Sequence, residues 1–203
     1  MDREWEDRAE IRAVIENWAI WRDYGDWERL RTCWHGDGRM HTVWFQGPAA
    51  DFIAHASGAK HRGGQSAHFL GGISIDLAGA RAIAQTKMQI LLRGPFEGVL
   101  CDATSTSRFY DFFDKRGGRW AIALRQVIYE KDRIDPVDPM AAPPRLDEKL
   151  LAQFPEGFRH MGYAQVRSGW NPKRDTPTLR GPEVERLYAR GKAWLAGGAL
   201  EIE

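Results

Sequence analysis

The sequence predicts an α+β domain in which the helices come first and long antiparallel strands follow. Residues 5–21 carry apolar side chains at helical spacing. Residues 66–135 instead alternate apolar and polar side chains in long runs separated by glycine-containing turns. Because helices and strands are segregated along the chain, we expect a layer of helices on an antiparallel sheet rather than a doubly wound sheet.

The first helix is predicted from a stripe of apolar residues with charges between them. This stripe consists of Ile11, Val14, Ile15, Trp18 and Trp21. The sequence DYGD then interrupts the pattern, so Gly25 is a candidate C-cap and Asp26 a candidate N-cap. We therefore expect a second short helix over residues 27–34.

The next segment predicts a turn, a strand and a third helix. HGDG, residues 35–38, is typical of a turn, and RMHTVWFQG, residues 39–47, is typical of a strand. GPAADFIAHASG then predicts a helix, because proline suits a first helical position.

Four long strands complete the expected domain, over residues 67–77, 80–94, 98–115 and 119–135. In the second strand, Ala84, Thr86, Met88, Ile90 and Leu92 alternate with polar residues, which indicates a half-buried strand. The sequence RGG, residues 116–118, suits a hairpin turn between the last two strands.

The composition changes after Asp135. The sequence DPVDPMAAPP predicts an extended linker, and the remainder predicts two short helices around a loop. We expect residues 1–135 to form the main domain. Residues 136–203 should form an extension that packs on this domain, on a partner subunit or over a pocket mouth.

Composition and charge limit the classes of function. A net charge of +1 argues against a general nucleic-acid binder or a binder of anionic membranes. The acidic, amphipathic N-terminal sequence is unlike a signal peptide, and no apolar run is long enough to span a bilayer. Cys33 and Cys101 form no disulfide framework. These observations predict a cytoplasmic protein.

Metal and nucleotide sites are not expected. His35, His41, His55 and His61 lie around turns and loops, and HExxH, HxH and CxxC patterns are absent from the sequence. The glycine-rich segments do not lead into a helix as a phosphate-binding loop does. We interpret residues 60–66 as a mobile loop over a pocket, and we expect no cofactor.

The order of elements and a few short sequences resemble a known family. A helix ending in RDYGDWERL, a strand, a helix beginning GP and four long strands resemble the SnoaL-like branch of the nuclear transport factor 2-like superfamily. The resemblance covers about residues 5–135 and is nearest to the scytalone dehydratase and hexachlorocyclohexane dehydrochlorinase group. It implies a cone-shaped α+β domain whose curved sheet and helices enclose one apolar pocket.

The same resemblance implies a histidine–aspartate pair. In that group a histidine at the start of the first long strand pairs with an aspartate at the end of the first helix, and these positions match His68 and Asp23. His68 would be the general base, and Asp23 would accept a hydrogen bond from its ring. From the residues alone, His68 could equally be a core histidine, and Asp23 could cap a helix or pair with an arginine. The lysine that the dehydrochlorinases place before the aspartate has no match here, since Trp18 lies near that position.

Further candidates come from the last strand and from the aromatic residues. Arg125 and Tyr129 share one face of that strand. If this face lines the pocket, Arg125 could polarise a substrate oxygen and Tyr129 could donate to a leaving hydroxyl; otherwise both are solvated. The chain has nine tryptophans, which suit a flat ligand as well as core packing. The expected substrate-binding residues are Tyr24, Trp18, Trp44, Phe69 and Met88.

The expected function is that of a cofactor-independent lyase acting on a small apolar, aromatic molecule. Loss of water is the simplest case, and loss of formaldehyde from aromatic diols is related chemistry known in this superfamily. An isomerase or cyclase in the same pocket remains open, as does a non-catalytic module such as a ligand-binding protein or a dioxygenase small subunit. The resemblance also implies a homodimer or homotrimer.

Overall fold

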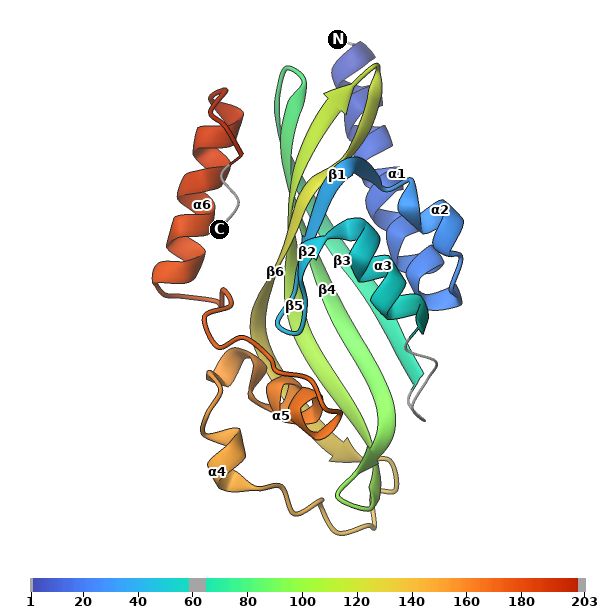
Figure 1. The fold of residues 1–203 in the computed structure, drawn as a ribbon, viewed down its shortest axis with the longest axis vertical. Coiled ribbons are helices and arrows are strands. Elements are labelled where there is room, and N and C mark those ends of the chain that lie inside the picture. The colour runs from blue at the N-terminus through green and yellow to red at the C-terminus, as the bar shows by residue number, and fades with distance from the viewer. Residues whose placement is uncertain (1, 59–64, 201–203) are drawn as a thin grey trace.

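The computed structural model describes residues 2–58 and 65–200 of the chain. Within these residues six strands form one curved mixed sheet with the order β2-β1-β6-β5-β4-β3, and helices pack on it (Figure 1). The predicted α+β class is therefore confirmed. The expected loop over residues 60–66 lies almost wholly outside the described residues.

Three helices cover one face of the sheet (Figure 1). Helix α1, Asp2–Tyr24, is followed by α2, Trp27–Arg31, and later by α3, Ala49–Gly58. Asp26 caps α2 by accepting a hydrogen bond from the backbone N–H of Arg29, as predicted. The second helix is shorter than expected, because the chain enters a strand at Trp34.

The segment HGDG forms part of a strand and not a turn. Strand β1, Trp34–His41, contains it and pairs in parallel with the last strand, with an irregular register between Trp34 and Arg39. A side chain at Gly38 would lie 2.8 Å from the carbonyl oxygen of Ile122, so this glycine lets the two strands approach closely. Strand β2, Gln46–Pro48, then pairs with β1 in antiparallel fashion. The predicted strand over residues 39–47 is thus two strands.

Four long strands form the antiparallel part of the sheet. They are β3, Gln65–Ala78; β4, Arg81–Phe96; β5, Val99–Arg116; and β6, Arg119–Pro136. Gly117 and Gly118 both have positive φ in the β5–β6 hairpin, which is the conformation that such a two-residue turn requires.

Successive side chains of a strand point to opposite faces of the sheet, so the buried side chains are divided between two cores. Phe109 and Val127 face α1 and α3 and belong to the larger core. Tyr110 and Ile128, one position further along their strands, face the opposite side and belong to a smaller core. The sheet is therefore apolar on both faces in its central part.

The C-terminal segment covers both faces. It contains α4, Glu148–Leu151; a 3-10 turn η1, Glu156–Phe158; α5, Arg159–Arg167; and α6, Pro182–Leu195. Helix α6 packs on the smaller core, where Gly191 allows close approach to Tyr110. Phe158 and Met161, from the η1–α5 region, join the larger core instead.

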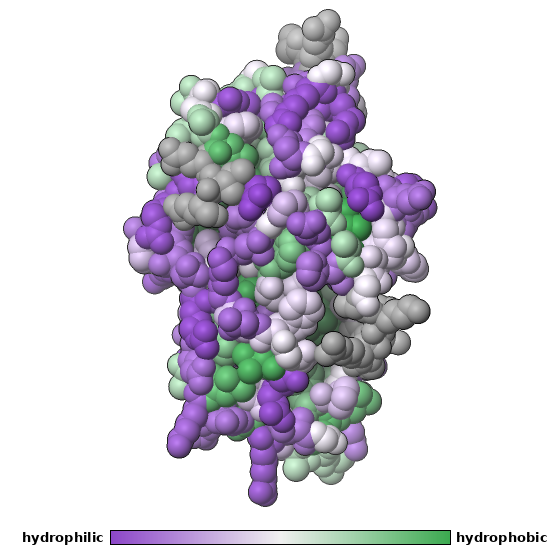
Figure 2. Space-filling model, viewed as in Figure 1, coloured by the Kyte–Doolittle hydropathy of each residue, from purple (hydrophilic) through white to green (hydrophobic). Residues whose placement is uncertain are grey.

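The surface is mostly hydrophilic on the face seen in Figure 2, with small apolar patches, one of them in the lower part of the view where α4 and α5 lie. None of the helices in the described ranges is long and apolar enough to cross a membrane.

Candidate active site

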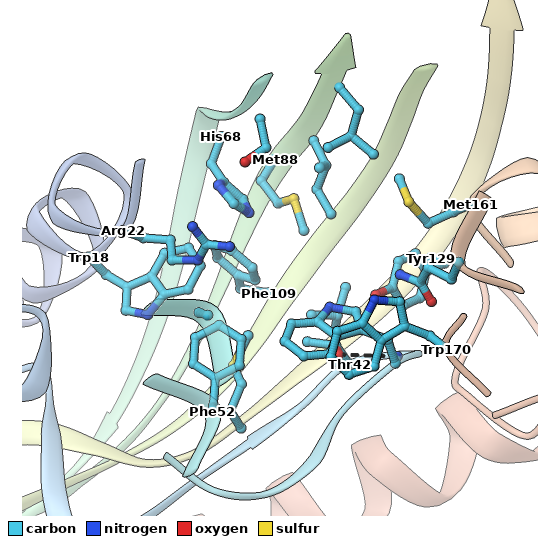
Figure 3. A pocket seen from close by; sticks show the side chains of 18 residues that line it. Trp18, Arg22, Thr42, Phe52, His68, Met88, Phe109, Tyr129, Met161 and Trp170 are labelled. Atoms are coloured by element: carbon cyan, nitrogen blue, oxygen red, sulfur yellow. Dashed lines mark hydrogen bonds between the residues drawn. The ribbon is translucent and has the colours of Figure 1, made fainter. Parts of the chain in front are cut away.

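A cavity of about 220 Å³ lies between the larger-core face of the sheet, the helices α1 and α3, and the C-terminal helix α5 (Figure 3). Most of its wall is aromatic or aliphatic. The lining residues include Trp18, Arg22, Trp44, Phe52, His68, Met88, Phe109, Tyr129, Met161, Gln165 and Trp170. A volume of about 220 Å³ is below the usual range for ligand pockets, so the cavity suits a small molecule.

His68 and Asp23 lie together at the wall of this cavity. The Nδ1 atom of His68 is 2.7 Å from Oδ1 of Asp23, and the backbone N–H of His68 donates to Oδ2 over 2.6 Å. Asp23 is in the last turn of α1, and His68 is near the start of β3. Both carboxylate oxygens are thereby fixed against one residue of the neighbouring strand.

This arrangement sets the tautomer of His68. Since an ionised carboxylate only accepts hydrogen bonds, the ring must carry its hydrogen on Nδ1, which leaves the lone pair of Nε2 unshared with Asp23. The Trp18 ring packs edge-on against the imidazole, with centroids 5.1 Å apart, and restricts its rotation. Figure 3 shows the His68 ring directed toward the cavity.

Burial lowers the pKa of His68 below its ordinary value of 6.5. The hydrogen bond and charge of Asp23 oppose this effect, while Arg22 and Arg125 add to it. The imidazole is therefore neutral near pH 7 and can accept a proton at Nε2. Once it does, the adjacent carboxylate stabilises the imidazolium.

Tyr129 also lines the cavity. Its hydroxyl accepts a hydrogen bond from the backbone N–H of Val43 over 3.2 Å. Burial raises the pKa of this phenol well above its ordinary value, so the group stays protonated. A protonated hydroxyl that accepts one hydrogen bond can still donate one, as a donor to a leaving group must.

Arg125 does not line the cavity, which corrects the expectation that it polarises a substrate oxygen. It shares a face with Tyr129 as predicted, but its side chain is 0% exposed. Its guanidinium donates two hydrogen bonds of 2.7 Å to Asp111 and stacks on Phe109. The buried ion pair supports the wall beneath the aromatic rings.

The expected substrate-binding residues divide into two groups. Trp18, Trp44 and Met88 line the cavity. Tyr24 and Phe69 do not, and they are 85% and 66% exposed. Each is adjacent in sequence to a residue of the pair, and the geometry of a helix end and of a strand turns neighbouring side chains to different sides. Both expectations are wrong.

Sequence reasoning missed several lining residues. Arg22 precedes Asp23 directly, and Phe52 lies on α3. Met161 and Gln165 are one helical turn apart on α5, and Trp170 follows that helix. The spacing of Met161 and Gln165 indicates one helix face, but nothing in the sequence says what this face covers.

A metal site is not evident in the described ranges, where no group of three or more histidine, cysteine, aspartate or glutamate side chains is placed to hold an ion.

The fold and the cavity define an α+β pocket protein of the kind that the resemblance implied. The family model described as a SnoaL-like domain matches residues 3–126. The chain therefore belongs to the SnoaL-like domain family.

Two relatives from Fusarium vanettenii are similar over almost the whole chain. A PEP2-like protein is 32% identical over 207 residues, covering 97% of this chain and 88% of that protein. Pea pathogenicity protein 2 is 31% identical over 208 residues, with the same coverage of 97% and 88%. Both matches extend beyond the family model into the C-terminal segment.

Solved structures share the fold at low identity. A candidate scytalone dehydratase from Novosphingobium aromaticivorans DSM 12444 has a TM-score of 0.54 and 17% identity, covering 71% of this chain and 96% of that one. A hexachlorocyclohexane dehydrochlorinase from Novosphingobium barchaimii LL02 has a TM-score of 0.51 and 16% identity, covering 70% and 97%. The predicted fold is confirmed, and both of these structures share it.

Proposed function

We propose that this protein is a cofactor-independent lyase in which His68 is the general base and Asp23 orients it. The substrate is a small apolar molecule with an aromatic ring. One observation carries the proposal: the His68 imidazole, held by a carboxylate through Nδ1, lines a mostly apolar cavity, and burial lowers its pKa. That is the constellation a proton abstraction requires.

The reaction begins when Nε2 of His68 removes a proton from a carbon or a hydroxyl of the bound molecule. The electron pair of the broken bond forms a new double bond, and a neighbouring group leaves. In a dehydration, the leaving hydroxide takes a proton from the imidazolium or from Tyr129 and departs as water. If the base instead deprotonates a hydroxymethyl group, the carbon–carbon bond breaks, formaldehyde is released and the released pair expels the neighbouring hydroxyl.

Each residue contributes a distinct part of the chemistry. Asp23 keeps the ring in the required tautomer and stabilises the positive charge that develops on it. Tyr129 lines the same cavity, and its hydroxyl would donate to an oxygen of the substrate. The aromatic wall, which includes Trp18, Phe52 and Phe109, excludes water and packs against a flat ligand.

The test is a screen of aromatic alcohols, diols and hydroxycarbonyl compounds by mass spectrometry, run in parallel with the wild-type protein and His68→Ala. A loss of mass corresponding to water or formaldehyde, seen with the wild type and reduced by about 10²–10⁴-fold in the variant, is the expected result. A product of unchanged mass would identify an isomerase or cyclase. Full turnover by a folded His68→Ala would refute the mechanism.

A further inference from the structure

Arg22 places a positive charge at the cavity wall, and among the described residues no carboxylate contacts it directly. The residue lies in the last turn of α1, directly before Asp23. Its guanidinium lies near the Trp27 and Phe52 rings, at 5.6 and 6.0 Å from their centroids. Among the described residues, no ion pair or hydrogen bond to this guanidinium is present, and both oxygens of the adjacent Asp23 accept from His68.

The rest of the cavity does not compensate this charge. Among the lining residues that the structure describes, none is an aspartate or glutamate, and Arg22 is the one side chain with a fixed charge. Burial lowers the pKa of the Arg22 guanidinium, and the charge of Asp23 opposes this effect. A partly buried cation that no carboxylate contacts directly favours a ligand that brings a negative charge.

The Arg22 guanidinium lies close to the His68 imidazole, the proposed base. Figure 3 shows the Arg22 side chain reaching into the cavity beside the His68 ring. Arg22 is also among the charges that lower the pKa of His68, in keeping with this proximity. A ligand held at Arg22 would therefore present its neighbouring atoms to the imidazole.

We propose that Arg22 binds a carboxylate of the substrate, which makes the substrate a small aromatic acid. This inference rests on the proposed function, since it names the substrate class of the same cavity. A guanidinium matches a carboxylate through two parallel N–H donors, and such bonds strengthen where water is excluded. The aromatic part of the acid extends along Phe52, Trp44 and Trp170, whose rings form a connected wall.

The test compares two probes of the same shape that cannot be turned over by elimination. trans-Cinnamate carries a carboxylate, and trans-cinnamamide carries a neutral amide in its place. Binding of each to the full-length protein is measured by titration calorimetry, and quenching of tryptophan fluorescence reports occupancy of the cavity. We expect the wild type to bind the acid at least about tenfold more tightly than the amide.

Variants locate the source of this preference. Arg22→Gln should bind the acid and the amide equally, while Arg22→Lys, which keeps the charge without the planar fork, should keep part of the preference. Arg12→Gln is the matched control, because Arg12 lies on the same helix and is exposed beside Glu16. It should behave as the wild type. Far-ultraviolet circular dichroism verifies that each variant is folded.

The outcomes separate this inference from the lyase mechanism. His68→Ala should keep the preference for cinnamate even though it loses turnover. A wild type that shows no preference for the acid, or that does not bind it, contradicts the role of Arg22, as does an Arg22→Gln variant that retains the full preference. Neither of these results bears on whether His68 is the base.

Discussion

Within the described residues, two histidine–aspartate pairs share one hydrogen-bond pattern in different surroundings. Asp23 accepts from Nδ1 and from the backbone N–H of His68. Asp132 accepts from Nδ1 of His160 over 2.9 Å and from the backbone N–H of Met161 over 2.6 Å. Each carboxylate therefore fixes a histidine ring and one backbone group.

The two pairs differ in their exposure and in their access to the cavity. His68 faces the apolar cavity, and its side chain is 10% exposed. His160 is 29% exposed and is absent from the described wall of that cavity, while Asp132 is 2% exposed. Asp132 instead accepts a hydrogen bond from a backbone N–H in the first turn of α5. The N-cap residue of this helix, Phe158, has no side-chain acceptor for that turn. A histidine–aspartate hydrogen bond therefore indicates a catalytic base only where the ring also has access to a cavity.

The largest effect is expected from removing the charge of Asp23. In Asp23→Asn the amide can donate to Nδ1, which favours the tautomer with hydrogen on Nε2 and disables the base. We expect kcat to fall by about 10²-fold while the protein stays folded. Steady-state kinetics measures kcat, with the substrate identified in the mass-spectrometric screen.

Asp26→Asn is the matched control for this variant. Asp26 lies three residues away and accepts from the Arg29 backbone in capping α2, a role that asparagine also fulfils. Its kcat should be unchanged. An equal loss in both variants would show that the effect comes from a disturbed helix end.

The next effect concerns pH. Because burial holds the pKa of His68 below 6.5, kcat/KM should be constant near neutrality and fall about tenfold per pH unit below the folded-state pKa. The free energy of unfolding should depend on pH through the protonation of the same residue. The unfolded chain binds a proton near pH 6.5 but folded His68 does so only at lower pH, so stability is lost as the pH falls below 6.5.

Two measurements examine this prediction. Nitrogen NMR of labelled histidines follows the protonation of His68 directly, with His68→Gln assigning the signal. Denaturant unfolding at pH 7 and pH 5 should show a smaller loss of stability in His68→Gln than in the wild type. An imidazolium at His68 at pH 7 would contradict the base mechanism.

A smaller effect is expected from the second pair. Asp132→Ala removes the acceptor for the first turn of α5 and should lower the free energy of unfolding by about 1–2 kcal/mol. Because α5 supplies Met161 and Gln165 to the cavity, KM should rise severalfold with little change in kcat. Hydrogen exchange across residues 159–167 should increase. A fall in kcat as large as that of Asp23→Asn would remove the distinction between the pairs.

Much of this site could be predicted from local patterns and one resemblance. The resemblance matched Asp23, at the end of the predicted first helix, with His68, at the start of the strand predicted over residues 67–77. Strand alternation indicated the shared face of Met88 and its neighbours. The expectation for Phe69 did not take account of the same alternation, which turns adjacent strand residues to opposite sides.

Other parts of the site depend on contacts between distant segments. Arg125 was expected at the substrate because it shares a strand face with Tyr129. That expectation was wrong because the register of β5 and β6 places Asp111 opposite Arg125, and no local pattern reveals this pairing. Trp170 reaches the cavity from a segment more than 100 residues beyond the Trp44 ring that it contacts. A single sequence contains no local signal for such long-range packing.

The most direct test of the account compares His68→Gln with His160→Gln on the same substrate. Both variants remove a ring that is hydrogen-bonded to an aspartate, so they differ chiefly in access to the cavity. If His68 is the base, kcat should fall by about 10²–10⁴-fold in His68→Gln and change less than about twofold in His160→Gln. Equal turnover by the two variants, or a larger loss in His160→Gln, would contradict it.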